Sequence, residues 1–222
     1  MEIFGLILLS ILLILQSSKM FLENREELAN SNKLKDNTSL QYQKKIEEAC
    51  VELLNPHGKV LQFGYSYGYA SKLITSFRID ELIIIEPIKE VFQKAKEWSK
   101  NNKSTKVLNS SIEDVLSSLS ELNSIYLDCF NVNSSDGKTD LQNIINTRRI
   151  SLIVESLLNT SVNNARFVVL FDASQSLNIN SMYLPYLKVT YHDVGKLLSL
   201  EHDDESLYKI VVIEKNSNNE EI

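Results

Sequence analysis

The chain of 222 residues has only two cysteines, Cys50 and Cys129, and only three histidines, His57, His192 and His202. Two cysteines do not make a disulfide framework, and this pair has no metal-ligand spacing. The histidines lie far apart and form no H-x-x-x-H pair. The sequence therefore predicts neither a disulfide-stapled fold nor a metal site, and Cys50 is interpreted as a small core residue of a helix.

An excess of positive charge is also absent, because the formal net charge is −6 at pH 7. The chain has no basic stripe with interleaved aromatic residues, so we expect no nucleic-acid partner. Hydrophobic residues make up 43% and charged residues 23% of the chain, which are values of a globular protein. No internal repeat or second domain is visible, and this length suits one domain with one full core.

A long hydrophobic run is lacking too, although residues 3–15 form a shorter apolar stretch. A bilayer span needs about 20 residues, whereas this stretch has the length of a signal-peptide core. We expect residues 1–20 to be a membrane anchor or a signal segment, and the sequence leaves both open. The domain is expected to face the cytosol, membrane-associated or cytoplasmic, with secretion as the alternative if residues 1–18 are cleaved. Further along, residues 21–38 are predicted as a polar linker, 39–215 as the domain and 216–222 as a frayed tail.

The most informative motif lies in residues 58–68. A short apolar strand ends there in the loop Gly64-Tyr65-Ser66-Tyr67-Gly68, and a helix follows from about Tyr69. Such a loop presents backbone N–H groups at a helix N-terminus and lets a ligand approach closely. About twenty residues later a second apolar strand ends in Glu86, whose carboxylate can accept hydrogen bonds from ribose hydroxyls. Together these features predict a nucleoside-type cofactor at the carboxyl ends of a parallel sheet.

The same loop also spells G-x-S-x-G, the nucleophile elbow of serine hydrolases. Asp172 and then His192 or His202 would complete the chain order of a catalytic triad with Ser66. An elbow, however, needs earlier strands to supply the oxyanion-hole donor, and no strand is expected before Lys59. A hydrolase is therefore the less favoured alternative.

Two further interpretations of the loop are weaker. Binding of a dinucleotide pyrophosphate needs G-x-G-x-x-G, but Ser66 replaces the second glycine and Tyr69 the third. A cofactor without phosphates tolerates these replacements better. A simple strand-to-helix turn would account for Gly64 and Gly68 but not for Glu86 at the end of the next strand.

Apolar strands alternate with helical segments over the rest of the chain. We expect strands at residues 59–63, 82–86, 105–108, 124–127, 166–171, 187–191 and 207–214, and helices at 39–54, 69–76, from Pro87, from Ser111 as the N-cap, and at 140–158. This order predicts a doubly wound, Rossmann-like α/β fold with a mostly parallel sheet, closed by an antiparallel C-terminal hairpin. Three strands end in acids, Glu86, Asp128 and Asp172, on the edge that faces the ligand crevice.

Several motifs resemble those of class I S-adenosylmethionine-dependent methyltransferases, over about residues 40–128. Within that class the chain is most similar to guanidinoacetate N-methyltransferase and its arginine-methylating relatives. The similarity rests on the glycine loop and on Ile79-Asp80-Glu81, Ile85-Glu86, Val91-Phe92-Gln93, Glu97-Trp98, Glu113-Asp114-Val115 and Tyr126-Leu127-Asp128.

The resemblance implies S-adenosyl-L-methionine as the cofactor and assigns a site to it. By this similarity the glycine loop wraps the methionine part, Glu86 holds the ribose, and the residues after the third strand flank the adenine. Asp128 would lie beside the transferring methyl and the acceptor nitrogen, as the catalytic residue. The implied cofactor-binding residues are Gly64, Tyr65, Ser66, Gly68, Glu86, Ser111, Ile112 and Asp128, and no metal is expected.

The function that follows is methyl transfer to a small molecule or a protein side chain, with N-methylation favoured and O-methylation as an option. Asp128 would hold a cationic amine or guanidine and then take its proton. Compared with the family, Gln62 replaces the acid of the first strand, and Tyr42 replaces a substrate-binding acid in the helix before it, with no acidic near neighbour. These differences leave a second class open: a membrane-tethered binding protein with this fold and no turnover.

Catechol-type O-methyltransferases are a second similar sub-family. By that similarity Asp128 and Asp172 would bind Mg²⁺, but the third ligand position is Ala173. An oxygen-only magnesium site needs more ligands than two carboxylates. The N-methylating relatives are therefore the better match.

Overall fold

The structure is a computed structural model that describes residues 37–128, 140–172, 177–198 and 208–216. The apolar segment at residues 1–20 and nearly all of the proposed linker lie outside the described residues. Within the described part, no helix combines the length and the apolar character that crossing a membrane requires.

Seven strands form one mixed sheet in the order β3-β2-β1-β4-β5-β7-β6. Their bounds are Gly58–Phe63 (β1), Ile79–Ile85 (β2), Thr105–Leu108 (β3), Leu122–Asp128 (β4), Ser161–Asp172 (β5), Leu187–Asp193 (β6) and Tyr208–Lys215 (β7). Strands β1 to β5 pair in parallel, whereas β7 pairs antiparallel with β5 and β6. The predicted fold class and the closing antiparallel hairpin are therefore confirmed.

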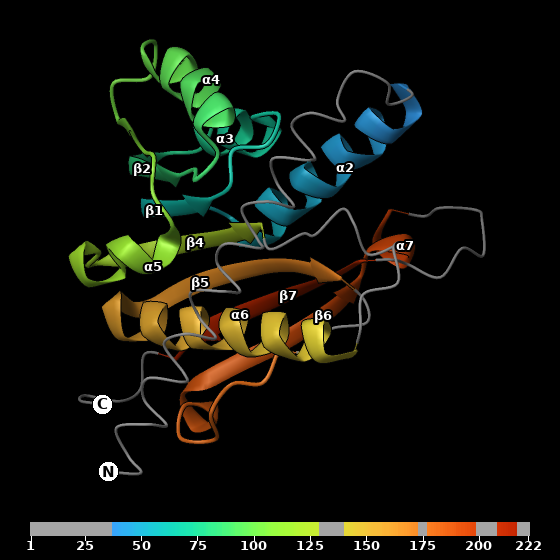
Figure 1. Cartoon of the computed structure of the whole chain (residues 1–222). Coiled ribbons are helices and arrows are strands. Elements are labelled where there is room, and N and C mark those ends of the chain that lie inside the picture. Colours follow the sequence, from blue (N-terminus) through green and yellow to red (C-terminus); the bar gives the residue numbers. More distant parts are fainter. Residues whose placement is uncertain (1–36, 129–139, 173–176, 199–207, 217–222) are drawn as a thin grey trace.

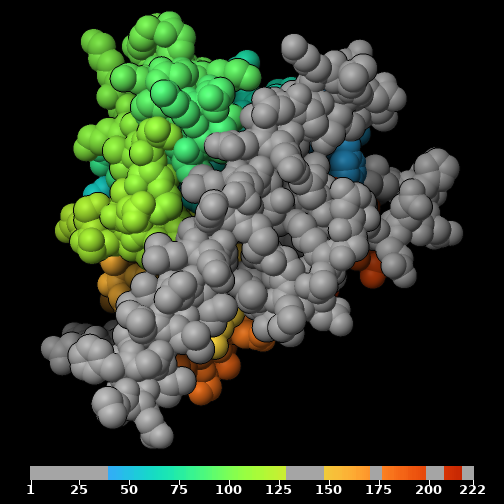
Figure 2. All heavy atoms as spheres, in the orientation of Figure 1, coloured from blue at the N-terminus to red at the C-terminus, as the bar shows by residue number. Residues whose placement is uncertain are grey.

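Helices cover both faces of this sheet (Figure 1). Their bounds are Asn37–Leu54 (α2), Tyr69–Ile74 (α3), Lys89–Ser99 (α4), Ile112–Val115 (α5), Asp140–Thr160 (α6) and Val194–Leu197 (α7), with short 3₁₀ turns at Leu116–Ser118 and Leu184–Tyr186. In the space-filling view, green atoms of the segment that runs from β2 to β4 form the upper left of the face shown (Figure 2).

The strand order reverses between β1 and β4, because β2 and β3 lie on one side of β1 while β4 and β5 lie on the other. In open α/β sheets that reversal marks the ligand crevice.

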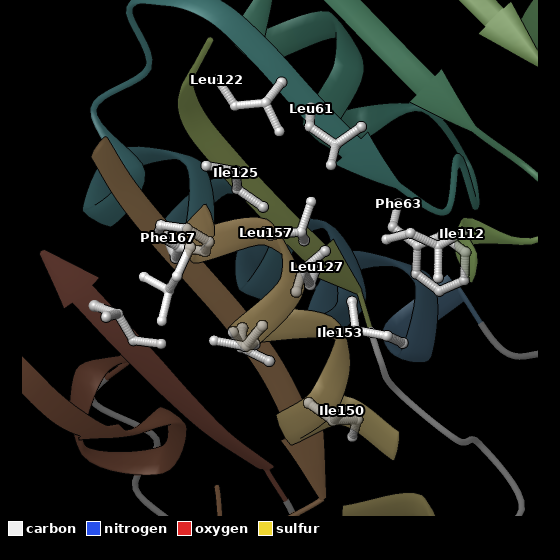
Figure 3. Packing of buried hydrophobic residues seen from close by; sticks show 14 of the residues in the cluster. Leu61, Phe63, Ile112, Leu122, Ile125, Leu127, Ile150, Ile153, Leu157 and Phe167 are labelled. Carbon is white, nitrogen blue, oxygen red and sulfur yellow. The ribbon is translucent and has the colours of Figure 1, made fainter. Parts of the chain in front are cut away.

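Side chains alternate between two cores because successive residues of a strand point to opposite faces. On the face covered by α6, Leu61 and Phe63 of β1 pack with Ile125 and Leu127 of β4. Figure 3 shows Ile150, Ile153 and Leu157 of α6 packing onto this layer, together with Ile112 of α5 and Phe167 of β5. Burial of these side chains is the main force that holds α6 on the sheet.

The opposite face carries the core that positions the candidate site. Here Val60 and Leu82 of the sheet pack against the apolar stripe of α2, formed by Ile46, Cys50, Val51 and Leu54. Helix α3 adds Ala70 and Ile74 to the same cluster. The glycine loop lies between β1 and α3, so this core fixes the loop against α2.

Most element bounds agree with the expected ones to within a few residues. The main differences concern the start of α4 and of β5. Helix α4 begins at Lys89 with Ile88 as its N-cap, so Pro87 precedes the helix instead of occupying its first turn. Strand β5 begins at Ser161, five residues before the expected start, directly after α6 ends at Thr160. The junction between α6 and β5 contains no glycine or proline that could have marked it in the sequence.

Candidate cofactor and methyl-transfer site

The loop after β1 has an alternating left-handed backbone. The φ angles are +85° at Gly64, +52° at Ser66 and +79° at Gly68. The N–H of Gly64 donates to the carbonyl of Ile85 (2.9 Å), and the N–H of Gly68 donates to the carbonyl of Tyr65 (2.8 Å). Ser66 therefore adopts the conformation that favours glycine, at the position where the resembling family has its second glycine.

Gly68 is required by a close approach as well as by its φ angle. A Cβ at this position would lie 2.6 Å from Oη of Tyr65, whose side chain folds back over the loop. The Tyr65 ring packs against Trp98 of α4, with ring centroids 5.9 Å apart, and only 7% of the residue is exposed. The Tyr65 side chain is thus part of the core, and Trp98 packs against the same core from α4.

Glu86, the expected ribose ligand, follows β2 and is fully buried. Its Oε2 accepts a hydrogen bond from the N–H of Tyr65 (2.8 Å), and its Oε1 accepts one from the N–H of Ile88 (2.9 Å). The carboxylate thereby ties the glycine loop to the start of α4. Each carboxylate oxygen has a second lone pair and can also accept from a ribose hydroxyl. That role of Glu86 stays a prediction.

Gln62 replaces the acid that the resembling family has in its first strand, and both ends of its amide are hydrogen-bonded within the fold. Its Nε2 donates to the carbonyl of Gly64 (2.7 Å), and its Oε1 accepts from Oγ of Ser71 (2.8 Å). The residue is 1% exposed. Gln62 therefore holds the loop to α3 and presents no carboxylate to a ligand.

Glu47 of α2 is the functional candidate that the sequence reasoning missed. We expected no acid near Tyr42 on this helix, but the Glu47 carboxylate lies at the glycine loop and is 3% exposed. Oε2 accepts from the N–H of Ala70 (2.9 Å) at the start of α3. Its other oxygen is 3.3 Å from Nε2 of Gln43, which donates in turn to Oγ of Ser66 (2.8 Å).

A signal for Glu47 was present in the helical spacing. Residue 47 lies three positions before Cys50, which the sequence predicted as a core residue of a helix, and seven before Leu54, so it shares their helix face. An acid on a buried stripe is unusual unless it has partners, and it marks a functional candidate. The stripe could therefore have shown that a carboxylate faces the loop.

Asp128, the expected catalytic residue, ends β4 and is 5% exposed. Burial first, and then the charge of Asp128, raise the pKa of Glu47 to about 8. The charge of Asp128 thus acts on Glu47, so ionising both buried carboxylates without a cation is unfavourable. The structure thus brings Asp128 together with the glycine loop and with Glu47.

The residues after β3 are placed as expected, but with divided roles. Oγ of Ser111 accepts from the N–H of Asp114 (3.3 Å) and so caps α5 as predicted. The Ile112 side chain is fully buried in the α6-side core. Its part in flanking an adenine therefore falls to backbone atoms and stays a prediction.

The hydrolase and the magnesium-site alternatives gain no support from this geometry. Among the described residues, Ser66 has the side chains of Gln43 and Glu47 as partners and contacts no histidine, and His202 lies outside them. Within the same residues, no group of three or more His, Cys, Asp or Glu lies close enough to hold a metal ion. Of the proposed magnesium ligands, Asp172 ends β5, and Ala173 lies outside the described residues.

The residues present fit S-adenosylmethionine. The left-handed loop after β1 suits the close approach of a ligand. Acceptors for hydroxyl and ammonium groups come from three acids, Glu86, Glu47 and Asp128. None of the three is a cation that could bind a phosphate, so the site agrees with a nucleoside cofactor that carries positive charge.

Comparison with solved structures gives the same fold. The N-methyltransferase NodS from Bradyrhizobium japonicum WM9 has a TM-score of 0.55 at 11% identity, over 82% of this chain and 99% of that chain. An rRNA methylase from Streptococcus thermophilus has a TM-score of 0.51 at 9% identity, over 82% and 98%. NSun6 from Pyrococcus horikoshii has a TM-score of 0.56 at 14% identity, over 76% of this chain and 51% of that chain. At these identities the similarity shows the fold alone.

Among curated proteins, none matches this chain in sequence at a significant level. A family model does match, under the description guanidinoacetate N-methyltransferase, over residues 45–208. This range contains most of the chain, including the glycine loop, Glu86 and Asp128. Because the family model and the fold agree, the cofactor is S-adenosylmethionine, and the chain belongs to the guanidinoacetate N-methyltransferase family of S-adenosylmethionine-dependent methyltransferases.

Proposed function

We propose that the protein transfers a methyl group to the nitrogen of a cationic amine or guanidine, carried by a small molecule or a protein side chain. The observation that carries this proposal is the buried carboxylate of Asp128 at the end of β4, beside Glu47 and the glycine loop. Bound S-adenosylmethionine supplies an electrophilic methyl group on a sulfonium sulfur. The protein has to orient the acceptor, exclude water and receive a proton.

Asp128 is assigned the proton-transfer role. A carboxylate at this position attracts a protonated nitrogen and orients it by a charge-assisted hydrogen bond. It then accepts the proton that the nitrogen loses as its lone pair becomes available to the methyl group. Burial strengthens this interaction, because less water competes for the carboxylate.

The acidic character of the site favours an amine over a nucleic acid as the acceptor. The formal net charge is −6, and the described site residues include three carboxylates and no cation that pairs with Glu47. A polyanion would meet unfavourable charge there. Some structural relatives are nucleic-acid methylases, so RNA is included in the test as a competing acceptor.

The experiment is an acceptor screen with labelled S-adenosylmethionine on the full chain. We expect label in amines or guanidines and none in RNA, and Asp128→Asn should lower the rate by roughly 10²- to 10⁴-fold. Glu48→Gln is the control for loss of a negative charge outside the site. Glu48 follows Glu47 in α2 but pairs with Lys44 at the surface, with 3.6 Å between Nζ and Oε1. Label in RNA alone, or full activity of Asp128→Asn, would refute the proposal. Cofactor binding without any product would support the alternative of a non-catalytic binding protein.

A further inference from the structure

The first strand of this protein presents no carboxylate to the cofactor. Both ends of the Gln62 amide are engaged, with Gly64 and with Ser71, as described above. An amide is also neutral, so it cannot form an ion pair with a charged group of a ligand. The positively charged α-ammonium of S-adenosylmethionine therefore needs a partner from another element.

The carboxylate of Glu47 reaches the same loop from α2. It accepts the N–H of Ala70 in the first turn of α3, and it interacts with the Ser66 hydroxyl at the middle of the loop. The side chain thus lies where the methionine part of the cofactor is expected to be wrapped. Helix α2 is held in place by its own core stripe, so the position of the carboxylate is fixed before any ligand binds.

Glu47 also lacks a cationic partner among the described residues, because no Lys, Arg or His there forms an ion pair with it. Its hydrogen-bond donors are neutral: the N–H of Ala70, the Gln43 amide and the Ser66 hydroxyl. A buried carboxylate in these surroundings either keeps a proton or acquires a cation.

Resting on the cofactor assigned above, we infer that Glu47 provides the carboxylate that binds the α-ammonium group of S-adenosylmethionine, in place of the acid that the first strand lacks. Binding then exchanges one positive charge for another. The proton held by Glu47 passes to the solvent, and the ammonium group takes its place beside the carboxylate. No bond to carbon is made or broken in this step.

The groups around Glu47 allow this exchange to be measured near neutral pH. The groups that face Glu47 are Asp128 from β4, Cys50 from α2, and Tyr65 and Tyr67 from the loop. Two further titratable groups of α2 face other partners: Lys44 lies near Tyr69 of α3, and Tyr42 lies near Tyr208 of β7. Burial raises the pKa of Cys50, Tyr65 and Tyr67, so these three groups stay uncharged at neutral pH. Glu47, whose pKa is raised to about 8, is then the group that loses the proton.

The test is calorimetry of the full chain in buffers of different ionisation enthalpy, which counts the protons released on binding. S-adenosylhomocysteine and 5′-methylthioadenosine form the ligand pair, because both have adenosine and a thioether but only the first has the α-ammonium. We expect release of about one proton with S-adenosylhomocysteine at pH 7 and none with 5′-methylthioadenosine. This comparison uses the wild-type chain and needs no variant to fold.

Variants then assign the proton to a residue. Glu47→Gln should abolish the release and weaken S-adenosylhomocysteine roughly 10- to 100-fold, while its affinity for 5′-methylthioadenosine stays unchanged. Glutamine keeps an oxygen that can accept the N–H of Ala70. Glu48→Gln is the control and should leave both ligands unaffected.

The outcomes separate this inference from the proposed function. Equal proton release by the two ligands, or unchanged release in Glu47→Gln, overturns the role of Glu47 and leaves methyl transfer standing. Proton release as expected without methylation of any acceptor supports Glu47 and contradicts the proposed function. Failure of the wild-type chain to bind either ligand contradicts both.

Discussion

Ser66 occupies a left-handed conformation that costs a residue with a Cβ about 1–2 kcal/mol. The same residue gains hydrogen bonds to Gln43 and Glu47 through its hydroxyl. A serine at this position therefore accepts a strained backbone conformation and gains hydrogen bonds that link the loop to α2.

Two substitutions separate these effects. Ser66→Ala removes the hydroxyl and keeps the backbone cost, whereas Ser66→Gly removes both. We expect Ser66→Gly to be more stable than Ser66→Ala by about 1 kcal/mol in urea unfolding, after the greater flexibility of unfolded glycine is included. Equal stability of the two variants would mean that the backbone at residue 66 is not under strain.

Glu86 also has a structural role that can be tested apart from the cofactor. Glu86→Ala leaves the N–H groups of Tyr65 and Ile88 buried without an acceptor. We expect the free energy of unfolding to fall by about 2–3 kcal/mol. Glu81→Ala on the same strand is the control, because Glu81 pairs with Lys106 at the surface and should change stability by less than about 1 kcal/mol. Similar losses in both variants would argue against the buried role of Glu86.

At this scale the sequence allowed some residues to be predicted and not others. Glu86 and Asp128 follow apolar strands, so their places at the sheet edge could be predicted from strand ends. The partners of Glu86 could not, because backbone N–H groups carry no residue identity. Glu47 was missed because the comparison was made at Tyr42, although the spacing of Glu47 from Cys50 and Leu54 places it on the buried face of α2.

At the scale of the elements, a charged pair joins α5 to α6 beside their shared apolar core. Nε of Arg149 lies 2.5 Å from Oε1 of Glu113, and the Arg149 side chain is 8% exposed. A pair this deeply placed is costly to break from one side, since the remaining charge stays desolvated.

Arg149→Met should therefore lower the free energy of unfolding by about 2–3 kcal/mol, and adding Glu113→Leu should recover part of the loss. Urea unfolding of the single and double variants measures the coupling. Lys100→Met, which breaks the exposed pair with Glu97, is the control and should cost under about 1 kcal/mol. Strictly additive losses at residues 113 and 149 would show that the two charges are not coupled.

The elements themselves were largely predictable because local patterns specify them. Four apolar runs gave β1 to β4, and the strand β3 was expected at its observed bounds, Thr105–Leu108. Junctions without glycine or proline, such as that between α6 and β5, were placed less well. Their positions depend on where strand pairing in the sheet ends, and the hydrophobic periodicity of one sequence does not show this.

For the molecule as a whole, Glu47 makes stability depend on pH. Its pKa is raised from 4.5 to about 8 on folding, so the folded chain binds more protons than the unfolded chain between these values. The stability that Glu47 contributes is complete below pH 4.5 and is lost as pH rises through about 8.

We expect the free energy of unfolding of the wild type to fall between about pH 5 and 8, relative to Glu47→Gln, by at most about 1.4 kcal/mol per pH unit. Urea unfolding at successive pH values measures the difference. Parallel curves for the two proteins would show that Glu47 is ionised in the folded state at neutral pH. Glu48→Gln should follow the wild-type curve.

The strand order has a consequence for how the chain is synthesised. Strands β1, β2 and β3 follow one another along the chain and can pair as soon as residue 108 has emerged. Strand β5, by contrast, receives its outer partner only from β7 at Tyr208–Lys215. Until that segment leaves the ribosome, the nascent protein carries an open edge of Phe167, Val168, Val169 and Leu170, the kind of edge that pairs with other chains. A message cut short before Tyr208 would thus yield an aggregating polypeptide, even though every residue of the candidate site had already been translated.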